Sequence, residues 1–181
     1  TYTGAPISLG ANTLTLSGGG SLVSGGVTLN NANSKLLLNS ITLDNATTSA
    51  DSLGLDVDNN STITALSVGY ITPVSIASGS SLSGGITVTA GSLKLNETGT
   101  LASTIAMSGG VLDADNSSTV SGALSHTADI TIDVANNKTL TYSGGNLNVG
   151  SHTLSIGGAG TFSNATGSPL VLNVPDSILN L

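Results

Sequence analysis

The chain has 181 residues, a net charge of −7 and no cysteine, and charged residues make up only 7% of it. Its fixed cations are three lysines, so it lacks the clustered Lys and Arg that neutralise phosphates; this excludes nucleic-acid binding and electrostatic docking to an anionic membrane. Without cysteine it can form neither disulfides nor thiolate metal sites.

Neutral polar residues must cover most of the surface. Aromatic residues are only 2% of the chain, while Ser, Thr, Asn and 24 glycines are abundant. Leu, Ile and Val are plentiful and regularly placed, which argues against disorder and favours β-structure. Apolar runs such as 36–38 are far shorter than the roughly 20 residues of a membrane span. No signal peptide is visible and the first residue is not Met, so we expect a processed piece of a longer protein.

The first third of the chain carries short alternating segments. In each, apolar residues alternate with small polar ones before a Gly, Asn or Ser group interrupts the pattern. Alternation with period 2 predicts a strand with one buried face, and Gly and Asn tolerate the positive φ of a turn. The segments are ISLGANTL from Ile7, LTLSGGGSL from Leu14, VTLNNANSKL from Val27 and ITLDNATT from Ile41.

Residues 55–120 repeat one nine-residue segment four times, and the copies follow one another with a constant 19-residue period. A short fixed period predicts a solenoid in which each repeat is one coil stacked on the previous one. We expect the four first residues to lie in a single file along the axis. The copies are LDVDNNSTI from Leu55, VSIASGSSL from Val74, LKLNETGTL from Leu93 and LDADNSSTV from Leu112.

A second strand is predicted after each turn. Two further sets of residues follow the same period there, which predicts two more apolar columns, and we expect a third short side near Val111 and Ile130. No segment has the i, i+3, i+4 pattern of an amphipathic helix. The two columns are Ile86, Ile105 and Leu124, and Val88, Met107 and His126.

Beyond residue 120 the period lengthens. IDVANNKTL starts at Ile132, a step of 20 from Leu112, and LSIGGAGTF starts at Leu154, a further step of 22. Insertions in solenoids go to the corners, so we expect the core to continue. Residues 163–181 contain two prolines and are predicted to be irregular; their last four residues resemble the opening of another coil, so more chain or a second copy is expected to dock there.

We therefore predict one all-β domain over residues 1–181, a parallel β-solenoid of about 19 residues per coil and roughly nine coils. Outward positions should also form columns, with Lys94 beneath Asp113 as an exposed ion pair. The two expected columns are Asp56, Ser75, Lys94, Asp113 and Asp133, and the turn positions Asn59, Ser78, Glu97, Asn116 and Asn136, whose amides could bond along the axis.

Two carboxylate pairs are the first candidate sites, Asp56 with Asp58 and Asp113 with Asp115. They could bind Ca²⁺, but six to eight oxygen ligands are needed and the calcium-binding nonapeptide repeat is missing, so we interpret them as solvated turn residues. A glycosidase or lyase would need further acids and platforms for sugar, which the sequence lacks. We assign no catalytic, cofactor-binding or metal residues.

Three other features receive structural interpretations. His126 is expected to be a partly buried spacer and His152 an exposed loop residue; together they make neither a triad nor a zinc site. Seven Asn-x-Ser/Thr sequons fall where the repeat needs a turn, so turn chemistry is favoured over glycosylation. Thr-x-Thr pairs, such as Thr139 with Thr141, could form a hydroxyl array for ice, but we expect no matching pair in neighbouring coils.

The sequence resembles a known group of proteins. The 19-residue period with its SGG and L-x-L elements is similar to haemagglutinin-type repeats of secreted bacterial adhesins, and two segments are similar to autotransporter passenger repeats. The resemblance covers nearly the whole chain; it implies a right-handed parallel β-helix outside a Gram-negative cell and carries no catalytic or ligand residues. The two segments are GANTLTLSGGGSLVSGGVTLN and GGNLNVGSHTLSIGGAGTFS.

These observations favour a structural, non-enzymatic protein, the extracellular shaft of a surface adhesin or fibre that could stack end to end. The alternative is a module that binds glycans or a host surface through a Thr/Asn face; a degraded enzyme scaffold is a third. Expected partners are a second copy, a continuing chain or glycans of a host or neighbouring cell, with no cofactor and no nucleic acid.

Overall fold

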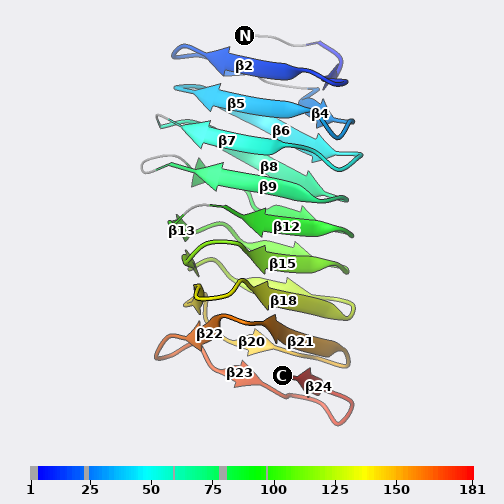
Figure 1. The fold of residues 1–181 in the computed structure, drawn as a ribbon, viewed down its shortest axis with the longest axis vertical. Coiled ribbons are helices and arrows are strands. Elements are labelled where there is room, and N and C mark those ends of the chain that lie inside the picture. Colours follow the sequence, from blue (N-terminus) through cyan, green and yellow to red (C-terminus); the bar gives the residue numbers. More distant parts are fainter. Residues whose placement is uncertain (1–3, 23–24, 59, 78–80, 97) are drawn as a thin grey trace.

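The chain is wound into a β-solenoid of about eight turns with roughly 20 residues per coil. The computed structural model describes residues 4–22, 25–58, 60–77, 81–96 and 98–181. Within those ranges the regular secondary structure consists entirely of β-strands. The two ends of the chain lie at opposite ends of the rod (Figure 1). The predicted parallel solenoid is confirmed, with about eight turns in place of nine because the later coils are longer than the repeat period.

Nine parallel strands form the front sheet, which faces the viewer in Figure 1, and each of the eight turns of chain between them adds one strand. Because each strand pairs with the strands of the coils above and below, its backbone hydrogen bonds run along the rod axis. The front sheet contains β2 (Thr13–Ser17), β5 (Lys35–Asn39), β7 (Gly54–Asp58), β9 (Thr72–Ile76), β12 (Ser92–Leu95), β15 (Val111–Ala114), β18 (Ile130–Val134), β21 (Thr153–Gly158) and β24 (Ile178–Asn180).

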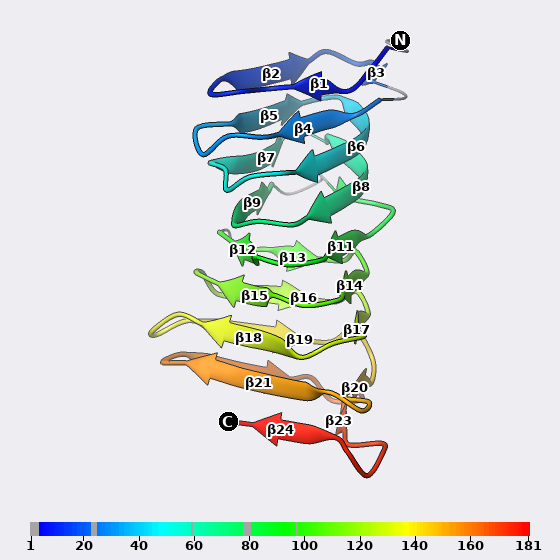
Figure 2. The same cartoon turned by 90° about the vertical axis from the view of Figure 1, so that its right-hand side faces the viewer.

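Three further sheets close the coils. The rear sheet, which Figure 2 shows along the rod, consists of β1 (Ile7–Ser8), β4 (Val27–Leu29), β6 (Thr42–Thr48), β8 (Thr62–Val68), β11 (Ile86–Val88), β14 (Ile105–Met107) and β17 (Leu124–His126), with β3 (Ser21–Leu22) and β10 (Ser81–Leu82) at its side. The side sheet consists of β13 (Thr100–Leu101), β16 (Ser118–Val120), β19 (Thr139–Tyr142) and β22 (Thr161–Asn164), and β20 (Leu147–Asn148) pairs with β23 (Leu170–Val171).

The core is a stack of aliphatic side chains inside the coils. The predicted columns of the second strand are confirmed, because Ile86 faces Ile105, which faces Leu124, and Val88 faces Met107 in the same strands. Ile105 is 0% exposed. Burying one such side chain stabilises the fold by roughly 1.5–3 kcal/mol, so the stack is the main source of stability.

The expected single file of repeat starts is wrong at one step. Leu55 faces Val74, and Leu93 faces Leu112, as predicted, but Val74 faces Leu95. The corners of this coil explain the shift: paired positions differ in sequence number by 19 between β8 and β10, by 20 between β8 and β11, and by 21 between β9 and β12. One extra residue is therefore added between β10 and β11 and another between β11 and β12. The 19-residue period of the sequence hides both additions.

The position of the third side was also predicted wrongly. Val111 and Ile130 belong to β15 and β18 of the front sheet, and the third side is the side sheet, which starts after the turn within each repeat. In the side sheet Val120 faces Tyr142, which is 1% exposed. The Tyr142 hydroxyl accepts a 3.2 Å hydrogen bond from the Leu124 backbone N–H, so this large ring replaces an aliphatic residue without leaving its polar atom unpaired.

The later coils keep the core although their lengths vary. Ile132 faces Leu112 as predicted, but Leu154 faces Ile130, a step of 24 in sequence number. Residues 163–181, predicted to be irregular, still hold β23 and β24, and β24 pairs in parallel with β21. Corner insertions therefore leave the front sheet continuous to its last strand.

Turn residues adopt the conformations that their types allow. Asn60 and Asn137, both in Asn-x-Ser/Thr sequons, have φ of 60° and 59°, in the left-handed region where Asn is favoured. This supports the interpretation of the repeated Asn as turn chemistry. Gly54 has φ of +94°, and a Cβ there would overlap the Pro73 carbonyl of the next coil, so only glycine fits this close approach.

Replacing Ile105 with Asp tests the core assignment. The variant places an unpaired charge in a fully buried column, which we expect to cost more than about 4 kcal/mol of unfolding free energy and to abolish folding. Ala106→Asp is the matched control, because the next side chain of the same strand is exposed and should change stability by about 0.5 kcal/mol or less. Circular dichroism and urea denaturation measure both; equal stabilities would contradict the inward assignment of Ile105.

Candidate functional site

Lysines bridge neighbouring coils on the front sheet. Lys94 Nζ lies 2.7 Å from Asp113 Oδ2 and 3.1 Å from Asp115 Oδ2 on the next coil, which confirms the predicted Lys94–Asp113 pair. Lys35 Nζ lies 2.7 Å from Asp56 Oδ2 in the same way. Three of the four aspartates in the predicted carboxylate pairs therefore make ion pairs with lysine, and these ion pairs link neighbouring coils.

The ion pair shifts the pKa of Lys94. Its hydrogen bond to Asp113 raises the pKa above the ordinary value, partial burial opposes this, and the bond to Asp115 adds to it. The expected column of five outward residues is broken on the N-terminal side of Lys94, which faces Pro73 in place of Ser75, because of the register shift between β9 and β12. On its C-terminal side the column holds, since Asp113 faces Asp133.

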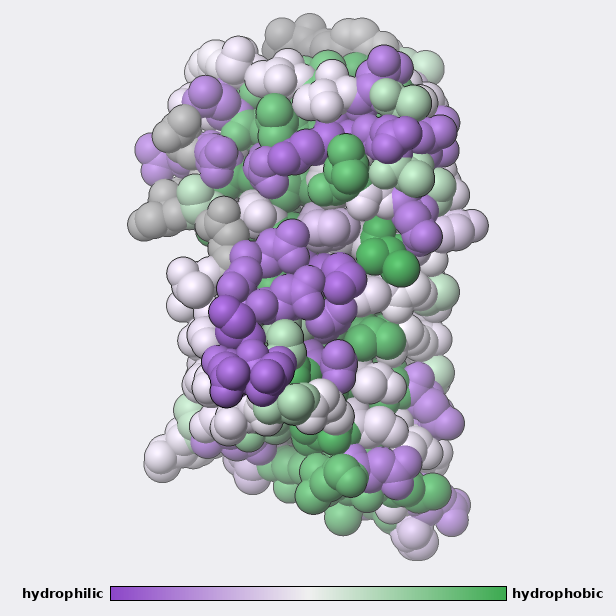
Figure 3. Space-filling model, in the orientation of Figure 1, coloured by the Kyte–Doolittle hydropathy of each residue, from purple (hydrophilic) through white to green (hydrophobic). Residues whose placement is uncertain are grey.

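Amide contacts also run along the axis beside this pair. Asn116 Nδ2 donates to the backbone carbonyl of Asn96, and Lys138 Nζ donates to Asn116 Oδ1 at 3.3 Å. At Asn116 the predicted amide column is thus held by a backbone carbonyl and a lysine. Three of its other members, Asn59, Ser78 and Glu97, lie outside the described residues. Figure 3 shows a hydrophilic patch on the same face, in the middle of the rod.

The charged groups of the described ranges do not gather further. No three or more His, Cys, Asp or Glu side chains within those ranges come close enough to hold a metal ion together. Of the carboxylate pairs that were considered for calcium and interpreted as turn residues, Asp56 and Asp58 lie three coils away from Asp113 and Asp115, so the two pairs are not brought into one site.

The side sheet brings hydroxyl groups together. Thr100 faces Thr119, Thr119 faces Thr141, and Thr141 faces Ser163, which makes a continuous column over four coils. A second column lies two residues earlier, where Thr139 faces Thr161 and its N–H donates to Ser117 Oγ at 3.1 Å. The two columns border a shallow groove of about 330 Å³, whose lining includes Thr98, Thr100, Ser117, Thr119, Thr139 and Thr141.

This hydroxyl groove is the feature that the sequence prediction missed. We expected no matching Thr pair beside Thr139 and Thr141, and the neighbouring coils indeed place one serine and one threonine there, but the prediction overlooked that these residues continue the hydroxyl columns. Thr100 and Thr119 occupy the column of Thr141, but the step in sequence number lengthens from 19 to 22 between one coil and the next. Alignment on the Asn turn, in place of the leucine period, could have revealed the match.

The groove presents its hydroxyls in a fixed lattice. Coils are about 4.8 Å apart and residues two apart along a strand are roughly 6.6 Å apart. The β-branched side chain of Thr is restricted at χ1, so the hydroxyls are held in place before any ligand arrives. Each hydroxyl can donate one hydrogen bond and accept two, which suits a neutral, hydroxyl-rich ligand.

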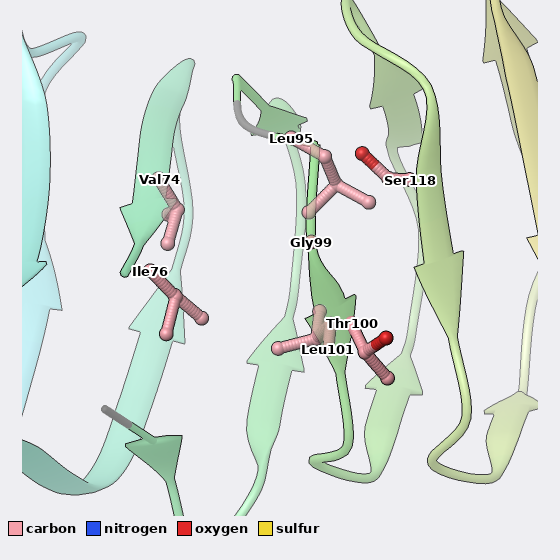
Figure 4. A pocket seen from close by; sticks show the side chains of 7 residues that line it. All are labelled: Val74, Ile76, Leu95, Gly99, Thr100, Leu101 and Ser118. Atoms are coloured by element: carbon pink, nitrogen blue, oxygen red, sulfur yellow. The ribbon is translucent and has the colours of Figure 1, made fainter. Parts of the chain in front are cut away.

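A small apolar cavity lies beside the groove, at the register shift. Ile76 faces Val57 of β7 but extends past the last position at which β9 pairs with β12, and it is only half-buried. The space next to it, whose lining residues Figure 4 shows, has a volume of about 30 Å³. That volume holds about one water molecule, whereas ligand pockets span roughly 300–1,000 Å³. The cavity is therefore a packing defect of the shifted coil. Its lining includes Val74, Ile76, Leu95 and Leu101.

The two histidines lie in adjacent coils. His126 faces Met107 and is partly buried, as predicted. His152 is half-buried in place of exposed, because its ring packs against that of His126 with centroids 5.9 Å apart and planes tilted by 57°. His126 Nδ1 lies 3.0 Å from the Ala128 carbonyl oxygen. Nothing in the repeat spacing indicated this contact, since a long corner brings the rings together.

Comparison with protein-family models, with curated proteins and with solved structures found no match. Within the described ranges no helix is long and apolar enough to cross a membrane.

A double-mutant cycle of Lys94→Met and Asp113→Asn tests the inter-coil ion pair. We expect a coupling energy of about 0.2–1 kcal/mol at neutral pH, because both groups are partly exposed to solvent. The pKa of Lys94 is raised on folding, so the coupling should persist below the ordinary lysine pKa and disappear as pH rises through the raised value. Urea denaturation below and above that range measures it; coupling that survives loss of the lysine charge would contradict the electrostatic interpretation.

Proposed function

We propose that this chain is a structural, non-enzymatic shaft that forms part of a bacterial surface adhesin or extracellular fibre. The observation that carries the proposal is the front sheet, in which nine parallel strands pair without interruption from β2 to β24. A rod of this kind separates whatever lies at its two ends, and the sparse charge and neutral polar surface suit an extracellular spacer.

The geometry supports a mechanical role. A force along the rod loads all the backbone hydrogen bonds between two coils at once, so they share the load. The Lys35 and Lys94 ion pairs cross the same coil boundaries and add modestly to them. The low charge also limits repulsion between stacked coils to few positions, such as Asp113 facing Asp133, since neighbouring coils are about 4.8 Å apart.

Extension of the rod at its C-terminal coil is part of this proposal. Apolar side chains are exposed there, and β24 has one neighbouring strand, β21, among the described strands. A following coil, from a continuing chain or from a second copy, would cover these side chains and pair with that strand. The exposed residues are Leu172, Val174, Ile178 and Leu181.

Electron microscopy over a concentration series tests extension by a second copy. We expect short rods at low concentration and filaments at high concentration. Ile178→Lys and Leu181→Lys together should suppress filaments by placing charges at the joint, and Thr131→Lys on the side of the front sheet should not. Short rods at every concentration would contradict stacking of copies. The shaft is tested separately by pulling single molecules along the axis: unfolding at the low force expected of coils without hydrogen bonds between them would contradict it.

A second function is favoured by the hydroxyl groove of the side sheet. We propose that this face, with Asn116 beside it, binds neutral glycans of a host or neighbouring-cell surface. Its support is the two parallel hydroxyl columns, which offer repeated donors and acceptors to a ligand that itself consists of repeated hydroxyl groups.

A glycan array tests the second function. Thr119→Val combined with Thr141→Val keeps the shape of the groove but removes two central hydroxyls, so binding should fall at least tenfold. Thr87→Val is the matched control, since this exposed threonine lies in β11 on the rear sheet. The absence of any bound glycan, or equal binding by the groove variant and the control, would leave the shaft as the only proposed role.

A further inference from the structure

One ring nitrogen of His126 is buried without a partner. Its Nε2 is one of three buried side-chain polar atoms in the described residues that make no hydrogen bond, and the other two are serine hydroxyls. A buried polar atom left unpaired costs free energy, so such an atom in a folded protein calls for a physical explanation, of which a ligand is one.

The hydrogen bond at the other nitrogen fixes the chemistry of Nε2. The Ala128 carbonyl can only accept, so His126 Nδ1 carries the proton and donates it. In the neutral ring, Nε2 then presents a lone pair. A histidine whose Nδ1–H donates to a backbone carbonyl while Nε2 stays free has the arrangement found in metal-binding histidines.

The position of His152 supplies a second imidazole at a suitable distance. Metal–nitrogen bonds of about 2.0–2.1 Å place the ring centroids of two imidazoles on one ion roughly 5–6.5 Å apart. The observed centroid distance of 5.9 Å lies within that range, and the 57° tilt excludes parallel stacking of the rings. Asp129 holds this corner, because its Oδ1 accepts a 2.8 Å hydrogen bond from the Thr153 N–H next to His152.

We propose that His126 and His152 together bind a transition-metal ion that prefers imidazole ligands, with water completing its coordination. Divalent copper should bind more tightly than zinc, following the general order of affinities for nitrogen sites, and calcium and magnesium should not bind because they require oxygen ligands. The ion would join the coil of β17 to the coil of β21 at a long corner. This inference is independent of the proposed shaft and glycan functions.

Titration of the chelator-treated, tag-free chain with copper(II) and with zinc chloride tests the site. We expect one bound ion per chain, a rise in melting temperature, and a copper electron paramagnetic resonance spectrum with coupling from two imidazole nitrogens. His126→Leu extends the aliphatic column of Val88 and Met107, and His152→Phe keeps a ring in the contact; each should weaken binding at least tenfold. Asp44→Asn, on β6 at the other end of the rod, should bind like the parent chain.

The outcomes separate the shared site from chance binding. Loss of affinity in both histidine variants, with the two-nitrogen spectrum in the parent, supports the proposal. Unchanged affinity in either variant, or a one-nitrogen spectrum, means an adventitious ion only and overturns it. If His126→Leu fails to fold, the His152→Phe variant decides by the same measurements, because its ring lies outside the aliphatic core columns.

Discussion

The fixed spacing between hydrogen-bonded coils is the constraint on which this structure depends. Every coil must present its backbone groups to its neighbours at about 4.8 Å, so each inward side chain meets an equivalent one directly above it. This requirement selects aliphatic residues of similar size inside, glycine where backbones approach closely, and small polar residues outside. It also explains how a chain with 2% aromatic residues can bury a continuous core.

The same stacking determines where functional groups can lie. Side chains from different coils meet along columns, so functional groups form rows along the rod axis in preference to enclosed pockets. The lysine pairs, the hydroxyl groove and the His126–His152 contact are all products of neighbouring coils. A ligand for this surface would therefore need to be repetitive, like a glycan, or small enough to fit between two coils, like a metal ion.

The period of the sequence predicted the fold and many of its contacts, but it did not locate the corners. Ile86, Ile105 and Leu124 could be aligned because the three coils have equal lengths, and Lys94 could be placed beneath Asp113 for the same reason. Val74 could not be matched with Leu95, because two separate one-residue additions change the register while the overall period is kept. The hydroxyl columns and the histidine contact were missed where the coils lengthen, because spacing along the chain there says little about distance in space.

The shift between β9 and β12 divides the rod into two stretches of different regularity. Among the described strands, β10 pairs with β8 and β13 pairs with β16, so the lateral ladder stops on one side of this boundary and restarts on the other. Within the described part of the chain, the front and rear sheets are the ones that cross it, and an imperfectly filled space lies beside them. Unfolding cooperativity should be lowest at this boundary. The coils before and after it can melt as separate units, and strain on a longer filament would concentrate there.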